Sequence, residues 1–188
     1  MSCENETYGH ENGLDKALFI ERLVIYFISL NLPTEYGPQM NYIFLQDIHS
    51  YFRYIILLFI LLAFLDAVIG LISGKAYSKS SKLFAVGGLV FSHVQLVAGL
   101  SLYLLNDWLE LLMSGGAMEN AQTRFFTVEH ISMMIIAIAL VTIGYSRAKR
   151  VEESKRKFRS IAIFYGIAIV IIFAMIPWPF LKDFGTWY

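Results

Sequence analysis

Three of the chain's four histidines lie inside or at the end of long apolar segments: His49, His93 and His130. A neutral imidazole can ligate a metal such as haem iron or relay a proton, because one ring nitrogen carries a free lone pair. Ionisable side chains are costly inside a bilayer and normally face the interior of a helix bundle, where they pair or hold a ligand. These three histidines are therefore the first candidates for a functional site.

Two arginines could accompany these histidines as anion-binding groups. Arg53 follows His49 by four residues, which places both side chains on one face of a helix, and Arg124 begins the apolar segment that contains His130. Guanidinium groups bind carboxylates through paired hydrogen bonds, so both arginines suit the propionates of a haem. The alternative is that they extend to the membrane interface, or that Arg53 forms an ion pair with Glu129.

Two further polar residues interrupt the apolar segments. Asp66 lies at about the expected level of His93, where a carboxylate could accept the second ring N–H of a metal-bound histidine. Alternatively, a protonated Asp66 could form a hydrogen bond between helices. Gln95 belongs to a stripe of small and polar residues whose spacing indicates helix packing, and within that stripe it is the one candidate for a site.

The elements that must position these residues are membrane-spanning helices. The chain has 188 residues, of which 57% are hydrophobic and 16% charged, which is too apolar for an ordinary soluble domain. Segments of about 20 apolar residues are long enough to cross a bilayer. The sequence predicts an all-α, antiparallel four-helix bundle in a membrane, with spans at about residues 50–73, 84–105, 125–146 and 160–181.

These spans also set the expected levels of the histidines. Counting about 1.5 Å per residue from the cytoplasmic end of each span puts His49 at roughly 37 Å, His130 at roughly 24 Å and His93 at roughly 15 Å. Two imidazoles can share one iron only if a nitrogen of each reaches it at about 2 Å. Helix tilt could absorb the smaller offset between His93 and His130, so we expect these two as the axial pair, with His49 and His130 as the second choice.

Basic residues cluster in two of the expected loops. Ten of the fifteen Lys and Arg residues lie in loops 74–83 and 147–159. Three of the four charged residues in 106–124 are acidic. The positive-inside rule predicts that these two loops are cytoplasmic and that both termini of the four-span unit lie outside. Basic runs can also bind nucleic acid, but the flanking apolar spans favour a topological role. The lipid bilayer is therefore an expected partner, and nucleic acid is not.

The first 39 residues differ from the rest. The apolar run at residues 18–30 contains Glu21 and Arg22 and is too short to span a bilayer. We interpret residues 1–39 as either an interfacial amphipathic helix or an extension from a misassigned start, and residues 40–188 as the transmembrane domain. Cys3 is the single cysteine, which excludes an internal disulfide and the CxxCH attachment of covalent haem.

Several short sequence patterns occur in an order that resembles one protein family. They are HSYFR at 49–53, HVQLVAG at 93–99, RFFTVEH at 124–130, IGYSRAK at 143–149 and IPWPF at 176–180. In these the chain resembles small bacterial four-span membrane proteins known as cytochrome B, from about residue 40 to residue 180. The resemblance implies a haem-b-binding membrane protein of electron transfer, with His49, His93 and His130 matching the family's histidines. The HxQxxxG segment and the EH pair are also similar to those of haem A synthase.

We therefore expect an integral protein of the bacterial cytoplasmic membrane that binds one b-type haem and transfers electrons. It would be an electron carrier rather than an enzyme, accessory to a respiratory assembly, with respiratory-chain subunits or quinone as candidate partners. One alternative is a cofactor-free membrane scaffold or accessory subunit. A third hypothesis is a metal or proton transporter that uses Asp66, His93 and Glu129 as a relay.

Overall fold

The computed structural model describes the backbone of residues 38–185 and the side chains of residues 42–185. The chain divides into two compact units, Met1–Ile43 and Phe44–Tyr188, and the bundle lies in the second. Most of the amino-terminal extension expected at residues 1–39 lies outside the described residues. The described elements are α2 (Pro38–Ser73), α3 (Lys79–Leu105), α4 (Trp108–Met113), η1 (Gly116–Met118), α5 (Ala121–Arg124), η2 (Phe125–His130), α6 (Ile131–Arg150) and α7 (Ser154–Met175).

In the part of the chain that the structure describes, four stretches of helix are long and apolar enough to cross a membrane. They are Tyr42–Ser73, Lys79–Leu105, Ala121–Arg150 and Ser154–Met175, and the third combines α5, η2 and α6. No strand occurs among residues 38–185. The predicted all-α, four-helix fold is therefore confirmed, and its four apolar helices suggest a multi-pass membrane protein.

The last helix ends earlier than the apolar run suggested. α7 stops at Met175, whereas the sequence predicted a span to residue 181. Pro177 and Pro179 explain the difference, because proline lacks the N–H that continues a helix and pushes the preceding residue toward an extended conformation. Ile176 has that conformation, with φ −71° and ψ 131°. Apolar character therefore continued past the point where the backbone could remain helical.

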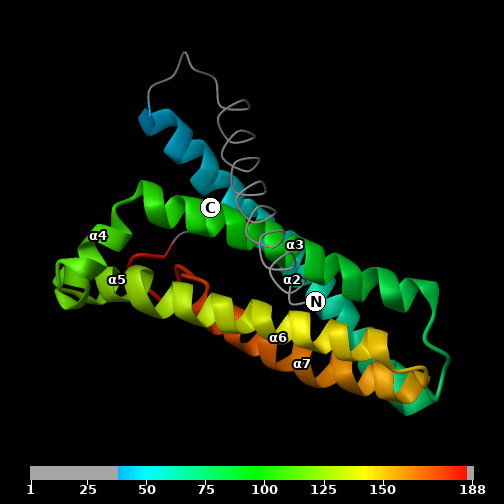
Figure 1. Cartoon of the computed structure of the whole chain (residues 1–188). Helices are drawn as coiled ribbons and strands as arrows, with labels where there is room; N and C mark the ends of the chain where they lie inside the picture. Colours follow the sequence, from blue (N-terminus) through cyan, green and yellow to red (C-terminus); the bar gives the residue numbers. More distant parts are fainter. Residues whose placement is uncertain (1–37, 186–188) are drawn as a thin grey trace, which may run out of the picture. The chain divides into compact units, whose positions relative to one another are not determined.

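Glycines let the four long helices approach one another closely, as is common in membrane bundles. Each of these glycines lies against a large side chain of a neighbouring helix: Gly70 against Phe158, Gly88 against Ile60 and Tyr165, Gly144 against Phe164, and Gly166 against Phe64. These contacts join α2 to α3, α2 to α7, α3 to α7 and α6 to α7. Figure 1 shows α6 and α7 side by side along their length.

The buried core consists of small and branched residues with a few large aromatic rings. Phe158 and Tyr165 of α7 are completely buried, and the Tyr165 hydroxyl donates to the Ala85 carbonyl of α3 at 2.6 Å. Most other large side chains of the helices face outward and are apolar. An outward-facing apolar surface of this kind fits helices that contact lipid rather than water.

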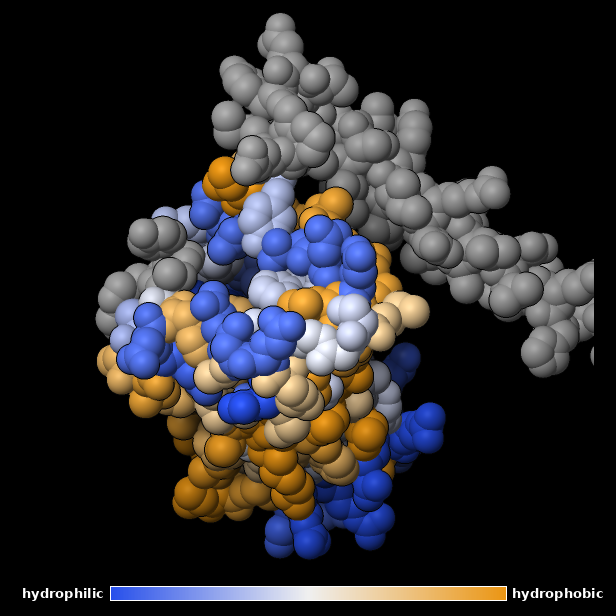
Figure 2. All heavy atoms as spheres, turned by 90° about the vertical axis from the view of Figure 1, so that its left-hand side faces the viewer, coloured by the Kyte–Doolittle hydropathy of each residue, from blue (hydrophilic) through white to orange (hydrophobic). Residues whose placement is uncertain are grey.

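The two ends of the bundle differ in character. The turn between α2 and α3 and the turn between α6 and α7 lie at one end, where the Tyr77 backbone N–H donates to the Ser154 hydroxyl at 3.0 Å. The short helices α4, η1 and α5 lie at the other end. Figure 2 looks onto this second end, where polar side chains gather above an apolar flank.

Candidate functional site at the end of the bundle that carries α4 and α5

Two of the three candidate histidines meet between α2 and the start of α6. The ring centroids of His49 and His130 are 6.4 Å apart and the ring planes make an angle of 65°. Both rings are only partly exposed. Counting along the helices had put them roughly 13 Å apart in level. That counting ignores helix tilt and the offset between neighbouring helices, and these two factors decide which residues meet.

A π-helical turn carries His130. η2 spans Phe125–His130 and interrupts an otherwise α-helical span. A π turn inserts one extra residue, which changes the direction of the side chains that follow, and such turns are frequent at functional sites. The buried Tyr103 hydroxyl of α3 donates to the Thr127 carbonyl within this turn at 3.0 Å. Sequence reasoning missed η2, because nothing in RFFTVEH distinguishes a π turn from an α turn.

The protonation of the His130 ring follows from its partner. His130 Nδ1 lies 2.8 Å from the Met175 carbonyl oxygen of α7. A carbonyl oxygen can only accept, so Nδ1 carries the proton and Nε2 keeps the lone pair of the neutral ring. Histidines that ligate metals usually have this arrangement, in which the second ring nitrogen donates to a backbone carbonyl and the orientation of the ring is set.

Two prolines free the carbonyls that hold this end of the bundle together. In an α-helix the Phe173 and Met175 carbonyls would accept from residues 177 and 179, which are prolines without an N–H. The Trp178 indole N–H donates to the Phe173 carbonyl at 2.9 Å instead, and His130 donates to the Met175 carbonyl. The IPWPF segment therefore contained a signal from which these contacts could have been predicted. Two prolines near a helix end leave backbone carbonyls free to accept hydrogen bonds from other side chains.

The His49 ring packs against α3 at Gly99. A Cβ atom at position 99 would lie 3.0 Å from Cε1 of His49. On the same helix face, Gln95 donates from Nε2 to the His49 carbonyl oxygen at 2.7 Å. Within the described residues, His49 Nδ1 and Gln95 Oε1 are buried and have no hydrogen-bond partner. Buried polar atoms normally have a partner, so these two atoms can form hydrogen bonds with a ligand or a water molecule.

Arg53 lies on the same stretch of α2, as the four-residue spacing predicted. Its side chain is 8% exposed. The guanidinium carbon lies 5.1 Å from the centroid of the Tyr54 ring and 5.8 Å from that of the buried Trp178 ring. Stacking on aromatic faces is favourable for a guanidinium and restricts its movement. A buried cation therefore lies one helical turn from His49.

Arg124 has a different environment from Arg53. Its Nε donates to Glu129 Oε1 at 2.8 Å, and the two side chains are 48% and 37% exposed. The ion pair expected between Arg53 and Glu129 is thus replaced by one between Arg124 and Glu129. Of the two arginines considered for an anionic ligand, Arg53 is buried within the site and Arg124 is bound to a carboxylate at the surface.

His93 is not brought together with His130. Its ring is exposed, with Nδ1 2.8 Å from the Leu89 carbonyl oxygen and Nε2 3.5 Å from the Thr142 hydroxyl of α6. Thr142 follows His130 by twelve residues, which corresponds to about 18 Å along the helix. No single iron could reach both imidazoles across that separation. The rings of His93 and His130 therefore do not meet, whereas those of His49 and His130 lie close together.

Asp66 lies near the opposite end of the bundle. Its carboxylate forms an ion pair with Lys75 at 2.6 Å, and the two side chains are 16% and 39% exposed. The expected contact with His93 is replaced by this pair, because Lys75 follows directly after the end of α2 and can reach back along it. Asp66, His93 and Glu129 each have a separate partner in the structure.

Two aromatic rings lie next to His130. Phe125 and Phe126 lie 5.7 and 6.3 Å from the His130 ring, and Phe184 of the carboxy-terminal segment lies 5.4 Å from Phe125. The Lys182 ammonium lies 4.5 Å from the centre of the Phe125 ring. The segment that follows α7 therefore folds back onto Phe125 and Phe126, the two rings beside His130.

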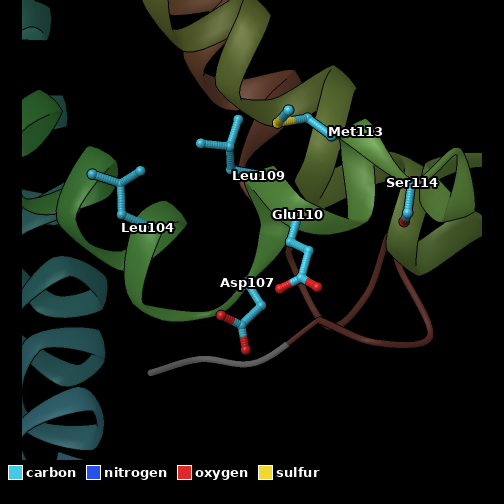
Figure 3. A pocket seen from close by; sticks show the side chains of 6 residues that line it. All are labelled: Leu104, Asp107, Leu109, Glu110, Met113 and Ser114. Carbon is cyan, nitrogen blue, oxygen red and sulfur yellow. The ribbon is translucent and has the colours of Figure 1, made fainter.

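A separate open pocket lies at the corner between α3 and α4. It has a volume of about 470 Å³, and Figure 3 shows the side chains that line it: Leu104, Asp107, Leu109, Glu110, Met113 and Ser114. Asp107 has a left-handed backbone, with φ 54°. None of the candidate histidines or arginines lines this pocket, so it is distinct from the site at His49 and His130.

Within the described residues, no group of three His, Cys, Asp or Glu side chains is placed to hold a metal ion. The site consists instead of two imidazoles from two helices. No family model, curated protein or solved structure matches the chain.

Proposed function

We propose that the chain is a membrane protein that binds one b-type haem through His49 and His130 and transfers electrons. The observation that supports this proposal is the pair of imidazoles at 6.4 Å within an apolar bundle. Two imidazoles from different helices at this separation would allow both rings to ligate one haem iron. The resemblance to cytochrome B in HSYFR and RFFTVEH points to the same two histidines.

The spacing of the two rings fits one iron between them. If one iron lay between the two rings with iron–nitrogen bonds of about 2 Å, the ring centroids would be roughly 6 Å apart. The distance of 6.4 Å agrees with that requirement. A second observation supports a bound ligand. His49 Nδ1 and Gln95 Oε1 are buried without a hydrogen-bond partner, and buried polar atoms normally have one.

Each neighbouring residue has a role that follows from its contacts. The Met175 carbonyl orients His130 and keeps its Nε2 lone pair available. Gly99 leaves room for the His49 ring, and Arg53 provides a buried positive charge for a propionate. When bound, a b-type haem supplies a one-electron couple, and the protein contributes ligation, electrostatics and exclusion of water.

The cellular setting is part of the same proposal. The basic turns at residues 74–83 and 147–159 would lie on the cytoplasmic side, and the end with His49 and His130 on the outer side of a bacterial inner membrane. Electron exchange would then take place near the outer surface, with respiratory-chain subunits or quinone as partners. Arg124 and Lys182 lie at this end and could contribute to contact with them.

Optical spectra of three single-histidine variants test the proposal. We expect the purified full-length protein to show a Soret band that shifts on reduction with dithionite, and His130→Ala or His49→Ala to abolish or strongly reduce it. His93→Ala is the matched control and should retain the spectrum, because His93 contacts Leu89 and Thr142 instead. A colourless protein after expression with added haem, or loss of the band only in His93→Ala, would refute the assignment.

A cofactor-free scaffold is the second candidate, and one observation favours it. His130, Gln95, Tyr103 and Tyr165 each donate to a backbone carbonyl of another helix. Such bonds stabilise membrane bundles by about 0.6 to 2 kcal/mol each without any cofactor. On this reading the histidine variants lower the thermal stability of a colourless protein, so one set of samples separates the two functions.

A further inference from the structure

Ten basic residues gather at the end of the bundle opposite the histidines. The turn after α2 and the turn after α6 lie together there, joined by the hydrogen bond from the Tyr77 N–H to Ser154 (Figure 1). The basic residues are Lys75, Lys79, Lys82, Arg147, Lys149, Arg150, Lys155, Arg156, Lys157 and Arg159. The acidic residues near them are Asp66, Glu152 and Glu153, which leaves an excess of seven positive charges.

Most of these cations have no carboxylate partner among the described residues. Lys75 pairs with Asp66, and Arg156 pairs with Glu153 at 2.9 Å. Tyr77 adds no negative charge to this end, because burial, together with the nearby Tyr145 and Asp66, raises the pKa of its hydroxyl to about 12. The positive charge at this end is therefore balanced only in small part by the protein itself.

The positive charges at this end are also unfavourable to the two helices that begin there. Both α3 and α7 begin at this end, and a helix amino terminus is stabilised by acidic residues. Neither helix has an acidic residue in its first turn. Lys79 and Lys82 begin α3, and Lys155 and Lys157 begin α7. Glu153 is the N-cap residue of α7, but the cations at the two helix starts outnumber it. A negatively charged partner outside the chain would offset their effect on the helix ends.

The cations are attached to a well-defined frame. Ser78 and Ser81 form a reciprocal capping box at the start of α3. Lys75 lies over the ring of Phe158, and Lys157 lies over the ring of Tyr77, with distances of 5.8 and 5.5 Å to the ring centroids. These contacts hold the two turns together across the end of the bundle, which keeps the charged surface in one piece.

We propose that this end of the bundle binds the headgroups of anionic phospholipids. The basic residues begin where the apolar spans end, which is the level of the lipid phosphates. Juxtamembrane clusters of Lys and Arg attract anionic lipids, and each cation adds to the attraction. This inference does not depend on haem binding, because no histidine takes part.

Lipid selectivity of the reconstituted full-length protein tests the inference. We expect spin-labelled phosphatidylglycerol to be immobilised at the protein surface several-fold more than spin-labelled phosphatidylcholine in mixed vesicles, and this preference to fall with added salt. A variant that combines Lys79→Gln, Lys82→Gln, Lys155→Gln and Arg159→Gln should lose most of the preference. The matched control combines Arg124→Gln and Lys182→Gln at the other end and should retain it.

Two competitors distinguish lipid from other anions. Glycerol phosphate in solution should not displace the labelled phosphatidylglycerol at equal concentration, because the lipid is already held at the surface. Equal immobilisation of the two lipids by the wild-type protein, or an unchanged preference in the fourfold variant, would overturn the inference. Displacement by glycerol phosphate, or by an oligonucleotide at equal charge concentration, would overturn it as well. Circular dichroism confirms that each variant keeps its helices.

Discussion

At the scale of single residues, prolines and a glycine determine where the polar side chains of the candidate site lie. Pro177 and Pro179 leave the carbonyls of Phe173 and Met175 without their helical donors, and Trp178 and His130 take those acceptors. Gly99 lets the His49 ring lie directly on α3. The proposed ligands are thus oriented by residues that carry no side-chain chemistry of their own.

Replacing Gly99 tests this view of His49. In Gly99→Ala the new Cβ would lie 3.0 Å from His49 Cε1, so the ring must move by a few tenths of an ångström. If His49 binds haem iron, we expect a shifted Soret band and faster haem loss to apomyoglobin. Gly166→Ala is the control, because its Cβ meets Phe64 and no histidine. Equal spectra for the wild type and Gly99→Ala would argue against ligation by His49.

At the scale of elements, the π turn η2 affects the direction of the His130 side chain. Phe125–His130 forms this turn near the start of a span that is otherwise α-helical. The turn widens the backbone and leaves weaker internal hydrogen bonds, so it needs support from a neighbour. Tyr103 of α3 provides that support through its hydroxyl. Tyr103 is therefore bonded to the turn that carries His130.

Removal of one oxygen atom tests the role of this contact. Tyr103→Phe deletes the hydrogen bond to the Thr127 carbonyl and should cost about 1 kcal/mol of stability in detergent, measured as a lower midpoint of thermal unfolding. If η2 positions His130, the variant should also show an altered low-temperature electron paramagnetic resonance spectrum of oxidised haem. Tyr51→Phe is the control, since Tyr51 is 61% exposed. An unchanged resonance spectrum with lower stability would limit Tyr103 to a packing role.

At the scale of the whole bundle, the two ends carry opposite chemistry. One end carries two imidazoles, a buried arginine and a layer of aromatic rings, and the other carries ten cations around two tight turns. Four apolar helices separate these ends. The proposed redox site and the proposed lipid-binding surface therefore lie at opposite ends of the bundle and can be altered independently.

Cysteine labelling tests this arrangement. In a Cys3→Ser background, we expect Ser80→Cys and Glu152→Cys to react with a membrane-impermeant maleimide only after the cells are opened. Ser114→Cys should react in intact spheroplasts, because it lies between the second and third spans. Detergent-solubilised protein, in which all three positions are exposed, provides the control for reactivity. Labelling of all three positions from one side would refute the four-span topology.

The sequence by itself determined the class of fold. Long runs of apolar residues demand helices in a bilayer, because only an intrasegment hydrogen-bond pattern satisfies the backbone there, and this reasoning requires no knowledge of packing. The same local logic located the turns, the basic loops and the spacing of His49 and Arg53. It failed at the end of α7, where proline stopped the helix before the apolar run ended.

Only the tertiary structure decided which polar residues meet. His49 pairs with His130 rather than His93, Asp66 with Lys75, and Arg124 with Glu129. Each of these choices depends on the tilt and relative shift of whole helices, and a shift of one turn moves a side chain by about 5 Å. Those shifts result from packing summed over many contacts, such as the glycines that receive Phe158 and Phe64, and no local pattern in the chain encodes them.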